Sequence, residues 1–334
     1  MVDMTAGRSV SAPSKARRQK SPIARFFGRK STIAFFMALP LILLIAVLVI
    51  YPAIYSLHLA SLNKSMKRFV GFDNFSFLLF KKDAFWTVVY SSVLFAVTAV
   101  IAKAIIGFIV AHFVHNIPAK GQRKWRGMLL VPWVIPPAMS TLAWLWLFDS
   151  SYGALNWTLT SWPVQWLATN SGFNWLLAFV GLGSVGAVPW IGEPGWARFS
   201  VILVNVWYGA PFFMIMYLAS LKSVPDALYE AAEIDGATWW QKIRYITLPM
   251  MRNIIAITTL FSLIVTFANF DIVRVLTQGG PLDQTHLFAT WAFEIGIRSG
   301  DIPLGASVSL FMVPILAIAA VFILRDINNR GNEA

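Results

Sequence analysis

The sequence predicts an all-α polytopic membrane protein with six transmembrane helices. Hydrophobic residues make up 57% of its 334 residues and charged residues only 13%, whereas soluble domains average about 45–50% apolar and about 25% charged residues. So little charge cannot cover the surface of a soluble globule of this size. The lack of cysteine excludes a disulfide-stapled extracellular scaffold, and the high apolar content excludes an intrinsically disordered chain.

Six stretches are long and apolar enough to cross a bilayer, whose hydrocarbon core of about 30 Å needs about 20 helical residues. They are residues 32–55, 86–114, 128–148, 199–221, 254–276 and 304–324. The third is interrupted by Pro132, Pro136 and Pro137. No small-residue cleavage site follows the first, so we expect an uncleaved helix rather than a signal peptide. The transmembrane domain is predicted to cover residues 31–330.

Basic residues in short loops predict the orientation of the spans. The tail over residues 1–30, predicted to be disordered, carries eight basic residues and one acidic residue. The loops after spans two and four are also basic, so both termini are predicted to be cytoplasmic. One basic cluster, over residues 64–82, falls outside in this topology and disagrees with it. The three other basic segments agree with cytoplasmic termini, so we keep this topology.

A long segment over residues 149–198 is predicted to be an external insert. Within it, residues 173–191 are apolar enough to suggest a seventh span, but they hold three glycines and a proline, which disfavour a helix. A crossing there would also move the basic loop over residues 222–252 to the outside. We therefore expect the insert to lie against the membrane or to pack on spans three and four.

The loop over residues 223–249 carries signals for two short helices. Ser223 and Asp226 have the spacing of a capping box, and Gly236 is placed as a helix-ending glycine. Thr238 and Gln241 form a second capping box, which starts another helix.

The second of these helices has an apolar face. Trp239, Ile243 and Ile246 recur at helical spacing, and Pro249 marks the start of span five. A helix–turn–helix with an apolar stripe outside the membrane is typical of a docking element for another protein. The alternative is that it packs beneath its own bundle.

This loop resembles the EAA loop of bacterial ABC importer permeases. The residues that carry the resemblance are Glu230, Ala231, Ala232, Gly236, Ile246, Leu248 and Pro249. Four other segments are similar to the carbohydrate branch of that family, the maltose- and glycerol-phosphate-type permeases. They are residues 69–75, 130–137, 148–156 and 270–281. The likeness covers residues 31–330 and departs at 157–192, which is longer than usual for the family.

The resemblance implies the MetI-like fold of type I importers in the bacterial inner membrane. It implies that the loop inserts as a coupling helix into a separate ATPase subunit. A second permease would complete the path, and a solute-binding protein would deliver a sugar, polyol or related solute. The sequence lacks the G-x-x-x-x-G-K-[ST] phosphate loop. The chain is therefore expected to be no enzyme and to bind no cofactor, with ATP and Mg²⁺ on the partner ATPase.

Polar residues within spans are costly and suggest function. In span five, Ser262, Thr266 and Asn269 fall on one stripe of a helix, and their hydroxyl and carboxamide groups suit the hydroxyls of a sugar. Asp271 and Arg274 follow them as a spaced pair.

Spans three and four add further candidates for the solute path. Asn205 and Tyr208 share a face of span four beside Gly209, and Trp133 offers a flat face for a sugar ring. By resemblance, the segments that hold these residues and the span-five stripe line the solute path. The alternative for each is an ordinary interhelical hydrogen bond, worth on average about 0.6 kcal/mol. Lys103 in span two is expected to snorkel or to pair within the bundle.

Other classes of function remain as alternatives or are excluded. An ABC permease for a non-carbohydrate solute stays open, and so does a secondary transporter, which would need two repeats of broken helices. Nucleic acid is excluded as a partner, because the surplus positive charge indicates orientation in the membrane. Membrane lipid is expected to be a partner of the spans. The four histidines show no metal-ligand spacing; they are His58, His112, His115 and His286.

Overall fold

The computed structural model describes residues 30–161 and 188–331. Most of the predicted basic tail, and most of the insert with its apolar stretch, lie outside the described residues. The chain divides into two compact units, Met1–Tyr55 and Ser56–Ala334. The described residues contain helices and no strand, apart from an isolated bridge between Leu62 and Phe69. The all-α prediction is confirmed for them.

The described part of the first unit, from residue 30 onward, is one nearly continuous apolar helix. It consists of α2 (Lys30–Ile45), a π-helical turn η1 (Ala46–Ile50) and the start of α3 (Tyr51–Ala60). The span that begins in it, Ala34–Ala60, is 27 residues long. Exposed Leu, Ile and Val side chains along it suit contact with lipid. This helix covers the predicted first span.

The second unit holds the remaining helices. Their bounds are α4 (Asp73–Lys81), α5 (Asp83–His115), α6 (Ala119–Leu129), α7 (Val131–Val134), α8 (Pro137–Leu147), α9 (Ala154–Thr160), α12 (Pro194–Leu221), α13 (Asp226–Ile234), α14 (Trp239–Lys242), η2 (Ile243–Thr247), α15 (Leu248–Phe267), α16 (Asp271–Leu276), α17 (Phe288–Phe293), η3 (Glu294–Arg298), α18 (Ile302–Leu310) and α19 (Met312–Gly331).

Five helices of the described residues are long and apolar enough to cross a membrane. They coincide with five of the six predicted spans. The third predicted span, residues 128–148, is not a continuous helix, so six transmembrane helices are not confirmed. The chain breaks between α6, α7 and α8, where Ile135 and Pro136 are extended. The prolines are the physical cause, because each lacks an amide donor and disfavours helical geometry in the preceding residue.

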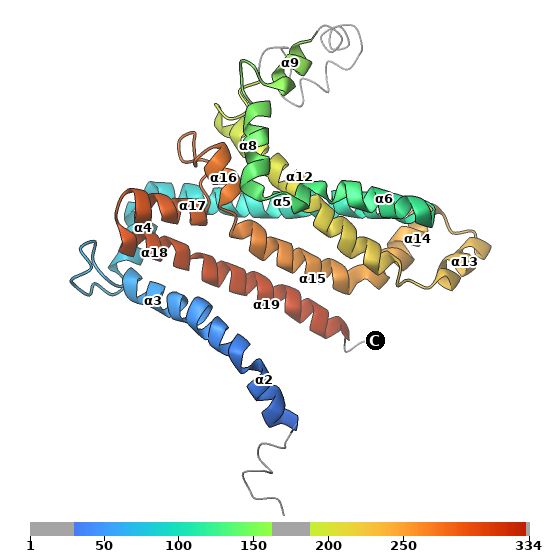
Figure 1. Cartoon of the computed structure of the whole chain (residues 1–334), viewed down its shortest axis with the longest axis horizontal. Coiled ribbons are helices and arrows are strands. Elements are labelled where there is room, and N and C mark those ends of the chain that lie inside the picture. The colour runs from blue at the N-terminus through green and yellow to red at the C-terminus, as the bar shows by residue number, and fades with distance from the viewer. Residues whose placement is uncertain (1–29, 162–187, 332–334) are drawn as a thin grey trace, which may run out of the picture. The chain divides into compact units, whose positions relative to one another are not determined.

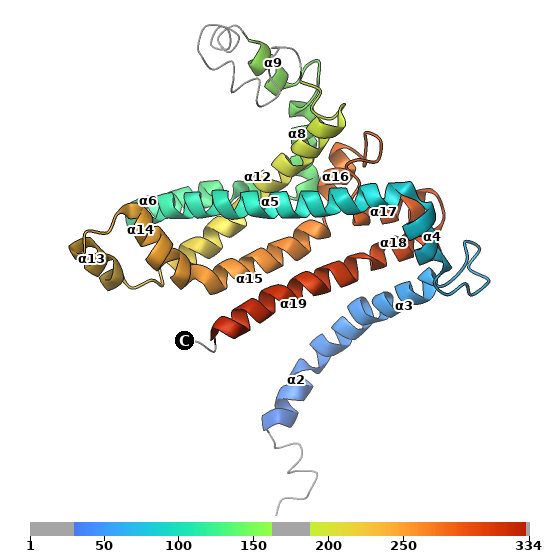
Figure 2. The same ribbon diagram turned by 180° about the vertical axis from the view of Figure 1, so that it is seen from behind.

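Helices α5, α12 and α15 lie side by side and form the centre of the second unit (Figure 1 and Figure 2). Gly107 of α5 packs directly on Phe213 of α12, where a methyl group would collide. Around this contact Met214, Tyr217 and Met251 form a buried cluster. A second cluster, around Phe95, Phe148 and Trp190, and a third, around Phe85, Phe288 and Trp291, bury the rest of α5. The long helix α5 is therefore the common wall of all three clusters.

Asn156 anchors the described parts of the insert. Its side chain donates to the carbonyls of Ser150 and Val188 at 3.2 and 3.1 Å and accepts from the Trp190 indole at 3.0 Å. The amide N–H of Val188 donates back to Asn156 at 3.0 Å. The Asn156 carboxamide of α9 thus connects Ser150, which precedes residues 162–187, with Val188 and Trp190, which follow them.

Candidate functional site

A glycine turn joins the two helices of the predicted docking loop. Helix α13 ends at Ile234, and Gly236 takes a left-handed φ of +72°. The N–H of Gly236 donates to the carbonyl of Glu233 at 3.0 Å, and that of Ala237 to Ala232 at 2.8 Å. This pattern closes a helix C-terminus and favours glycine at the left-handed position. The predicted glycine turn is confirmed.

The second predicted capping box forms, and the first does not. The backbone of Thr238 donates to Gln241 Oε1 at 2.7 Å, and Gln241 N–H returns to the Thr238 hydroxyl at 3.4 Å. The prediction for Ser223 and Asp226 is wrong. Ser223 instead donates its hydroxyl to the carbonyl of Ser220 at 2.7 Å, because it still belongs to the turn that ends α12.

Two side-chain contacts fasten α13 to α14 and η2, which lead into α15. Lys242 Nζ lies 2.6 Å from Glu233 Oε1, and the hydroxyls of Tyr229 and Thr247 lie 2.9 Å apart. The carboxylate of Glu233 is 68% exposed, so the ion pair adds little stability. Its geometric effect remains, because the two contacts bracket both ends of η2. The two contacts therefore fix the position of α13 relative to the turn that leads into α15.

The docking loop exposes apolar side chains. Ile234, Trp239 and Tyr245 are 88%, 61% and 74% exposed. A hollow of about 300 Å³ lies beside the glycine turn, lined by residues that include Ala232, Gly236, Tyr245 and Ile246. Ile243, predicted to share the apolar face, is buried within the chain. One residue of the predicted stripe thus packs inward, as the alternative of packing beneath the bundle requires, while Trp239 stays largely exposed.

The docking loop also touches α5. The indole N–H of Trp239 donates to His112 Nε2 at 3.1 Å, with the two rings in an edge-to-face arrangement. His112 belongs to the last turn of α5. The loop is therefore connected to two of the three central helices. It continues directly into α15, and it is joined to α5 by the hydrogen bond between Trp239 and His112.

Lys103 lies at the meeting point of α5, α12 and α15. Its amine donates to Asn205 Oδ1 at 3.0 Å and to Thr266 Oγ1 at 2.6 Å. All three side chains are buried. The expectation that Lys103 pairs within the bundle is confirmed, and its partners are two of the predicted path residues. For Asn205 and Thr266, the interhelical hydrogen bond is the contact present here.

Gly209 makes room for this lysine. A methyl group at Gly209 would lie 2.5 Å from Cδ of Lys103, well inside ordinary contact distance. The glycine stands one helical turn after Asn205, so the two residues present the same part of α12 to the lysine. Gly209 therefore contributes to the cluster by leaving room for the lysine side chain, not by a polar group of its own.

The other predicted path residues are placed separately. Ser262 is buried on α15 one turn before Thr266, and Tyr208 is half-buried. Trp133 is 44% exposed and stacks on Phe212 at 5.9 Å between ring centres.

Asn269 departs from the predicted stripe. Helix α15 ends at Phe267, so Asn269 lies in the connector to α16 and not on the helix that carries Ser262 and Thr266. Within the described residues its buried Oδ1 has no hydrogen-bond partner.

The predicted pair of Asp271 and Arg274 is not formed. Arg274 lies 3.6 Å from Glu294 Oε2 instead and covers the ring of Phe293 at 5.0 Å. Asp271 opens α16, where a carboxylate suits the helix N-terminus. The i, i+3 spacing therefore did not predict the partner of the arginine, which lies on η3.

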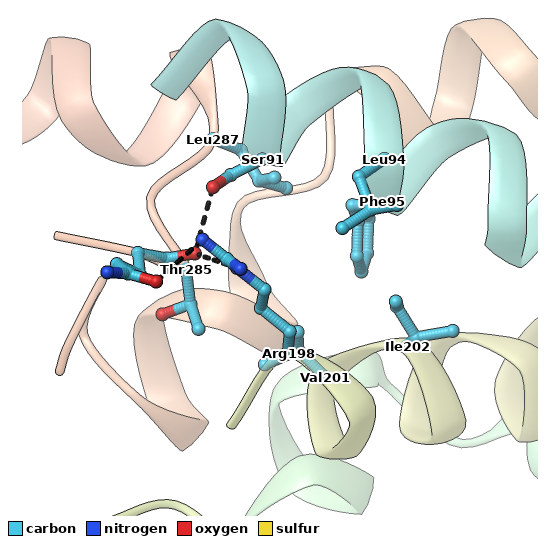
Figure 3. Close-up of a pocket in the computed structure, with 9 residues that line it drawn as sticks. Ser91, Leu94, Phe95, Arg198, Val201, Ile202, Thr285 and Leu287 are labelled. Carbon is cyan, nitrogen blue, oxygen red and sulfur yellow. Dashed lines mark hydrogen bonds between the residues drawn. The ribbon is translucent and has the colours of Figure 1, made fainter. Parts of the chain in front are cut away.

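Arg198 holds the loop that follows α16, a clamp that the sequence did not indicate. Its guanidinium donates to the backbone oxygen and the side-chain oxygen of Gln284, at 3.0 and 2.7 Å (Figure 3). Ser91 of α5 donates to the same backbone oxygen at 2.9 Å. The partners stand 86 and 193 residues from Gln284, so no local pattern could have revealed them. The loop is thereby tied to α5 and α12.

His286 packs against the glycine of the same loop. A methyl group at Gly279, where φ is +95°, would collide with the imidazole. Burial lowers the pKa of His286, against the opposing effect of the Asp283 and Glu294 carboxylates. Its Nδ1 lies 3.1 Å from the Thr290 hydroxyl. Within the described residues, no group of three His, Cys, Asp or Glu side chains is placed to hold a metal ion.

Comparison with known proteins decides the family. The profile of the binding-protein-dependent transport system inner membrane component matches residues 103–332. The chain belongs to this family. The permease is 30% identical, over 88% of its length and 94% of the relative, to the trehalose/maltose transport system permease protein MalF of Thermococcus litoralis. It is 26% identical, over 87% of its length and 89% of the relative, to the sulfoquinovosyl glycerol transport system permease protein SmoG of Agrobacterium fabrum.

A solved structure shares the fold. The permease aligns with a chain of a bacterial ABC transporter involved in the import of the acidic polysaccharide alginate, with a TM-score of 0.72. The two chains are 21% identical, and the alignment covers 91% of the permease and 98% of the other chain. The permease is thus a multi-pass protein of the inner membrane, and its family is the membrane component rather than the ATPase of such systems.

Proposed function

We propose that the permease forms, with a second permease subunit, the path by which a sugar, polyol or related solute crosses the membrane. A solute-binding protein delivers the solute, and separate ATPase subunits bind ATP and Mg²⁺. Relatives named for trehalose/maltose, galactooligosaccharides and sulfoquinovosyl glycerol support a carbohydrate solute.

The coupling element in this proposal is the loop from residue 223 to 249. Exposed apolar side chains and a hollow beside the glycine turn suit insertion into a partner. The residues assigned to coupling are Glu230, Ala231, Ala232, Gly236, Ile246, Leu248 and Pro249.

The observation that carries the proposal is the continuous connection from this loop to the buried polar cluster. The contacts of α13 hold it to η2, and α15 runs from there to Thr266. That length of helix is about 27 Å at 1.5 Å per residue, close to the hydrocarbon thickness. Movement of the loop is thereby delivered to the Lys103 cluster, where three helices meet.

The solute path in this proposal follows polar and aromatic groups around that cluster. Its residues are Trp133, Asn205, Tyr208, Gly209, Ser262, Thr266 and Asn269. The unpartnered Oδ1 of Asn269 and the half-buried Tyr208 supply free hydrogen-bonding groups. Asn205 and Thr266 become free for a solute when the helices separate from Lys103 in the alternating-access cycle.

A glycine replacement tests the coupling role. Gly236→Val forces a β-branched side chain into a left-handed turn, so we expect normal membrane insertion but loss of ATP-dependent uptake by the assembled importer. Gly300→Val is the matched control, because Gly300 also has a left-handed φ, +69°, and open space around it. Normal uptake in Gly236→Val, or equal loss in both variants, would count against the coupling assignment.

A further inference from the structure

An apolar groove of about 380 Å³ runs between α5, α12 and the α6–α7 segment. Ile106 and Val110 of α5, Met128 and Pro132, and Trp207 and Met214 of α12 are among its lining residues. Every lining residue is apolar, and none of the proposed path residues lines it. The groove extends along α12 from Leu203 to Met214, a length of about 16 Å.

Basic side chains stand at the α6 end of this groove. Lys120, Lys124 and Met128 follow one another at i, i+4 and i+8, so they share one face of α6, and Met128 lines the groove. Both lysines are exposed, and neither has an ion-pair partner among the described residues. Trp125, 47% exposed, lies beside them, and tryptophan favours the interfacial layer of a membrane.

The groove and the lysines lie at different depths of the bilayer. Helix α5 has 33 residues and is about 50 Å long, which exceeds the hydrocarbon core of about 30 Å. Helix α6 follows the end of α5 after three residues and lies beside it (Figure 2). The lysines of α6 therefore stand at the headgroup layer, while the groove extends from there into the hydrocarbon.

We propose that this groove is a binding site for an anionic phospholipid. One acyl chain lies in the groove between α5 and α12, and the headgroup phosphate is held by Lys120 and Lys124. The two ammonium groups are one helical turn apart, which lets them share one phosphate. The apolar walls select a hydrocarbon chain, and the lysines select negative charge.

A partner helix fits this groove poorly. The groove is lined by apolar side chains alone, so a helix packed on it would gain apolar contact only. Such a helix would leave Lys120 and Lys124 without anionic partners.

Quenching of Trp207 tests the site in the purified full-length protein. Phosphatidylglycerol and phosphatidylcholine, each with brominated acyl chains, are titrated into the detergent-purified permease. The signal of Trp207 is isolated from the 15 tryptophans by subtracting the Trp207→Phe variant. We expect phosphatidylglycerol to reach half-quenching at a concentration about 30-fold lower than phosphatidylcholine, since each basic residue contributes about fivefold.

Two variants separate the lysines from the groove. The double variant Lys120→Gln/Lys124→Gln should lose the preference for phosphatidylglycerol and keep the quenching. Val110→Phe narrows the groove and should weaken quenching by both lipids, with thermal melting confirming that it folds. The control Lys222→Gln/Arg325→Gln removes the same charge away from the groove and should retain the preference.

Three results would overturn the proposal. One is equal half-quenching by the two lipids in the natural protein. Another is equal loss of selectivity in the lysine variant and its control. The third uses the absence of natural cysteine: a single Ile106→Cys that cross-links to another subunit in the assembled importer would make the groove a protein interface.

Discussion

The amine of Lys103 donates a hydrogen bond to the hydroxyl of Thr266 at 2.6 Å, across 163 residues of sequence. The same amine holds Asn205 at 3.0 Å, so one side chain of α5 joins α12 and α15. The backbone groups of these helices are already satisfied, and hydrogen bonds between membrane helices average only about 0.6 kcal/mol. Lys103 is thus the point at which side-chain hydrogen bonds join the three central helices.

A double-mutant cycle on Lys103 and Thr266 tests this role. Lys103→Met and Thr266→Val each remove one end of the hydrogen bond with similar side-chain volume. We expect each to lower ATP-dependent uptake about tenfold, because each would displace residues of the proposed solute path, and the double variant to lose little more. Thr266→Ser keeps the hydroxyl and should retain uptake. Additive losses in the double variant would show that the two residues act independently.

Replacement of Gly209 by alanine should destabilise the protein. The added methyl group would lie 2.5 Å from Lys103 Cδ, and forcing a buried side chain aside costs about 1–3 kcal/mol. The control is Gly195→Ala, at the start of the same helix, where a methyl group meets nothing within 4 Å. Thermal melting in detergent should place Gly209→Ala below the natural protein and Gly195→Ala at or above it. Equal melting temperatures would contradict the close packing of Lys103 on Gly209.

The polar positions of this cluster were predictable from sequence, but their partners were not. Asn205 and Thr266 stand out because polar groups inside apolar spans are expensive. Their common partner Lys103 is 102 and 163 residues away, and a single sequence carries no signal for such a contact. The contact of Arg198 with Gln284 could not be predicted for the same reason, because it depends on how α12 packs beside the loop after α16.

Features formed by hydrogen bonds between neighbouring residues were predicted correctly where no other partner competed for those groups. Gly236 and the Thr238 capping box were predictable because their hydrogen bonds stay within a few residues. Ser223 has an equally good local pattern, but the carbonyl of Ser220 at the end of α12 takes its hydroxyl. In the third predicted span the prolines were visible and indicated an interruption, yet apolar length alone placed a membrane span there. Proline geometry outweighed apolar length there.

The Trp239 contact with His112 predicts a coupling defect without loss of docking. Trp239→Phe keeps an aromatic ring but removes the donor, and a neutral hydrogen bond contributes about 0.5–1.5 kcal/mol. We therefore expect uptake to fall about two- to tenfold at an unchanged amount of bound ATPase subunit. Trp240→Phe is the control, because Trp240 is similarly exposed, at 65%, and contacts the ring of Trp239. Equal uptake in the two variants would count against a link through His112.

His286 predicts a loss of stability in acid. Burial lowers its pKa from the ordinary value of 6.5, although Asp283 and Glu294 oppose the shift and Arg274 reinforces it. Well above pH 6.5 the imidazole is neutral in the folded and the unfolded chain, so its contribution is complete. As the pH falls below 6.5, the unfolded chain takes up the proton first, and this lowers the free energy of unfolding. The decrease continues until the pH falls below the lowered pKa of His286 in the folded protein.

Thermal melting of the purified permease between pH 8 and pH 5 measures this effect. His286→Gln removes the titrating group and keeps a side chain able to bond to Thr290, so its melting temperature should fall less steeply below pH 6.5. The difference between the two melting curves removes the effects that the two proteins share. That difference should be constant above pH 7 and should shrink in acid, because protonation destabilises only the natural protein. A difference that stays constant down to pH 5 would contradict a buried, neutral His286.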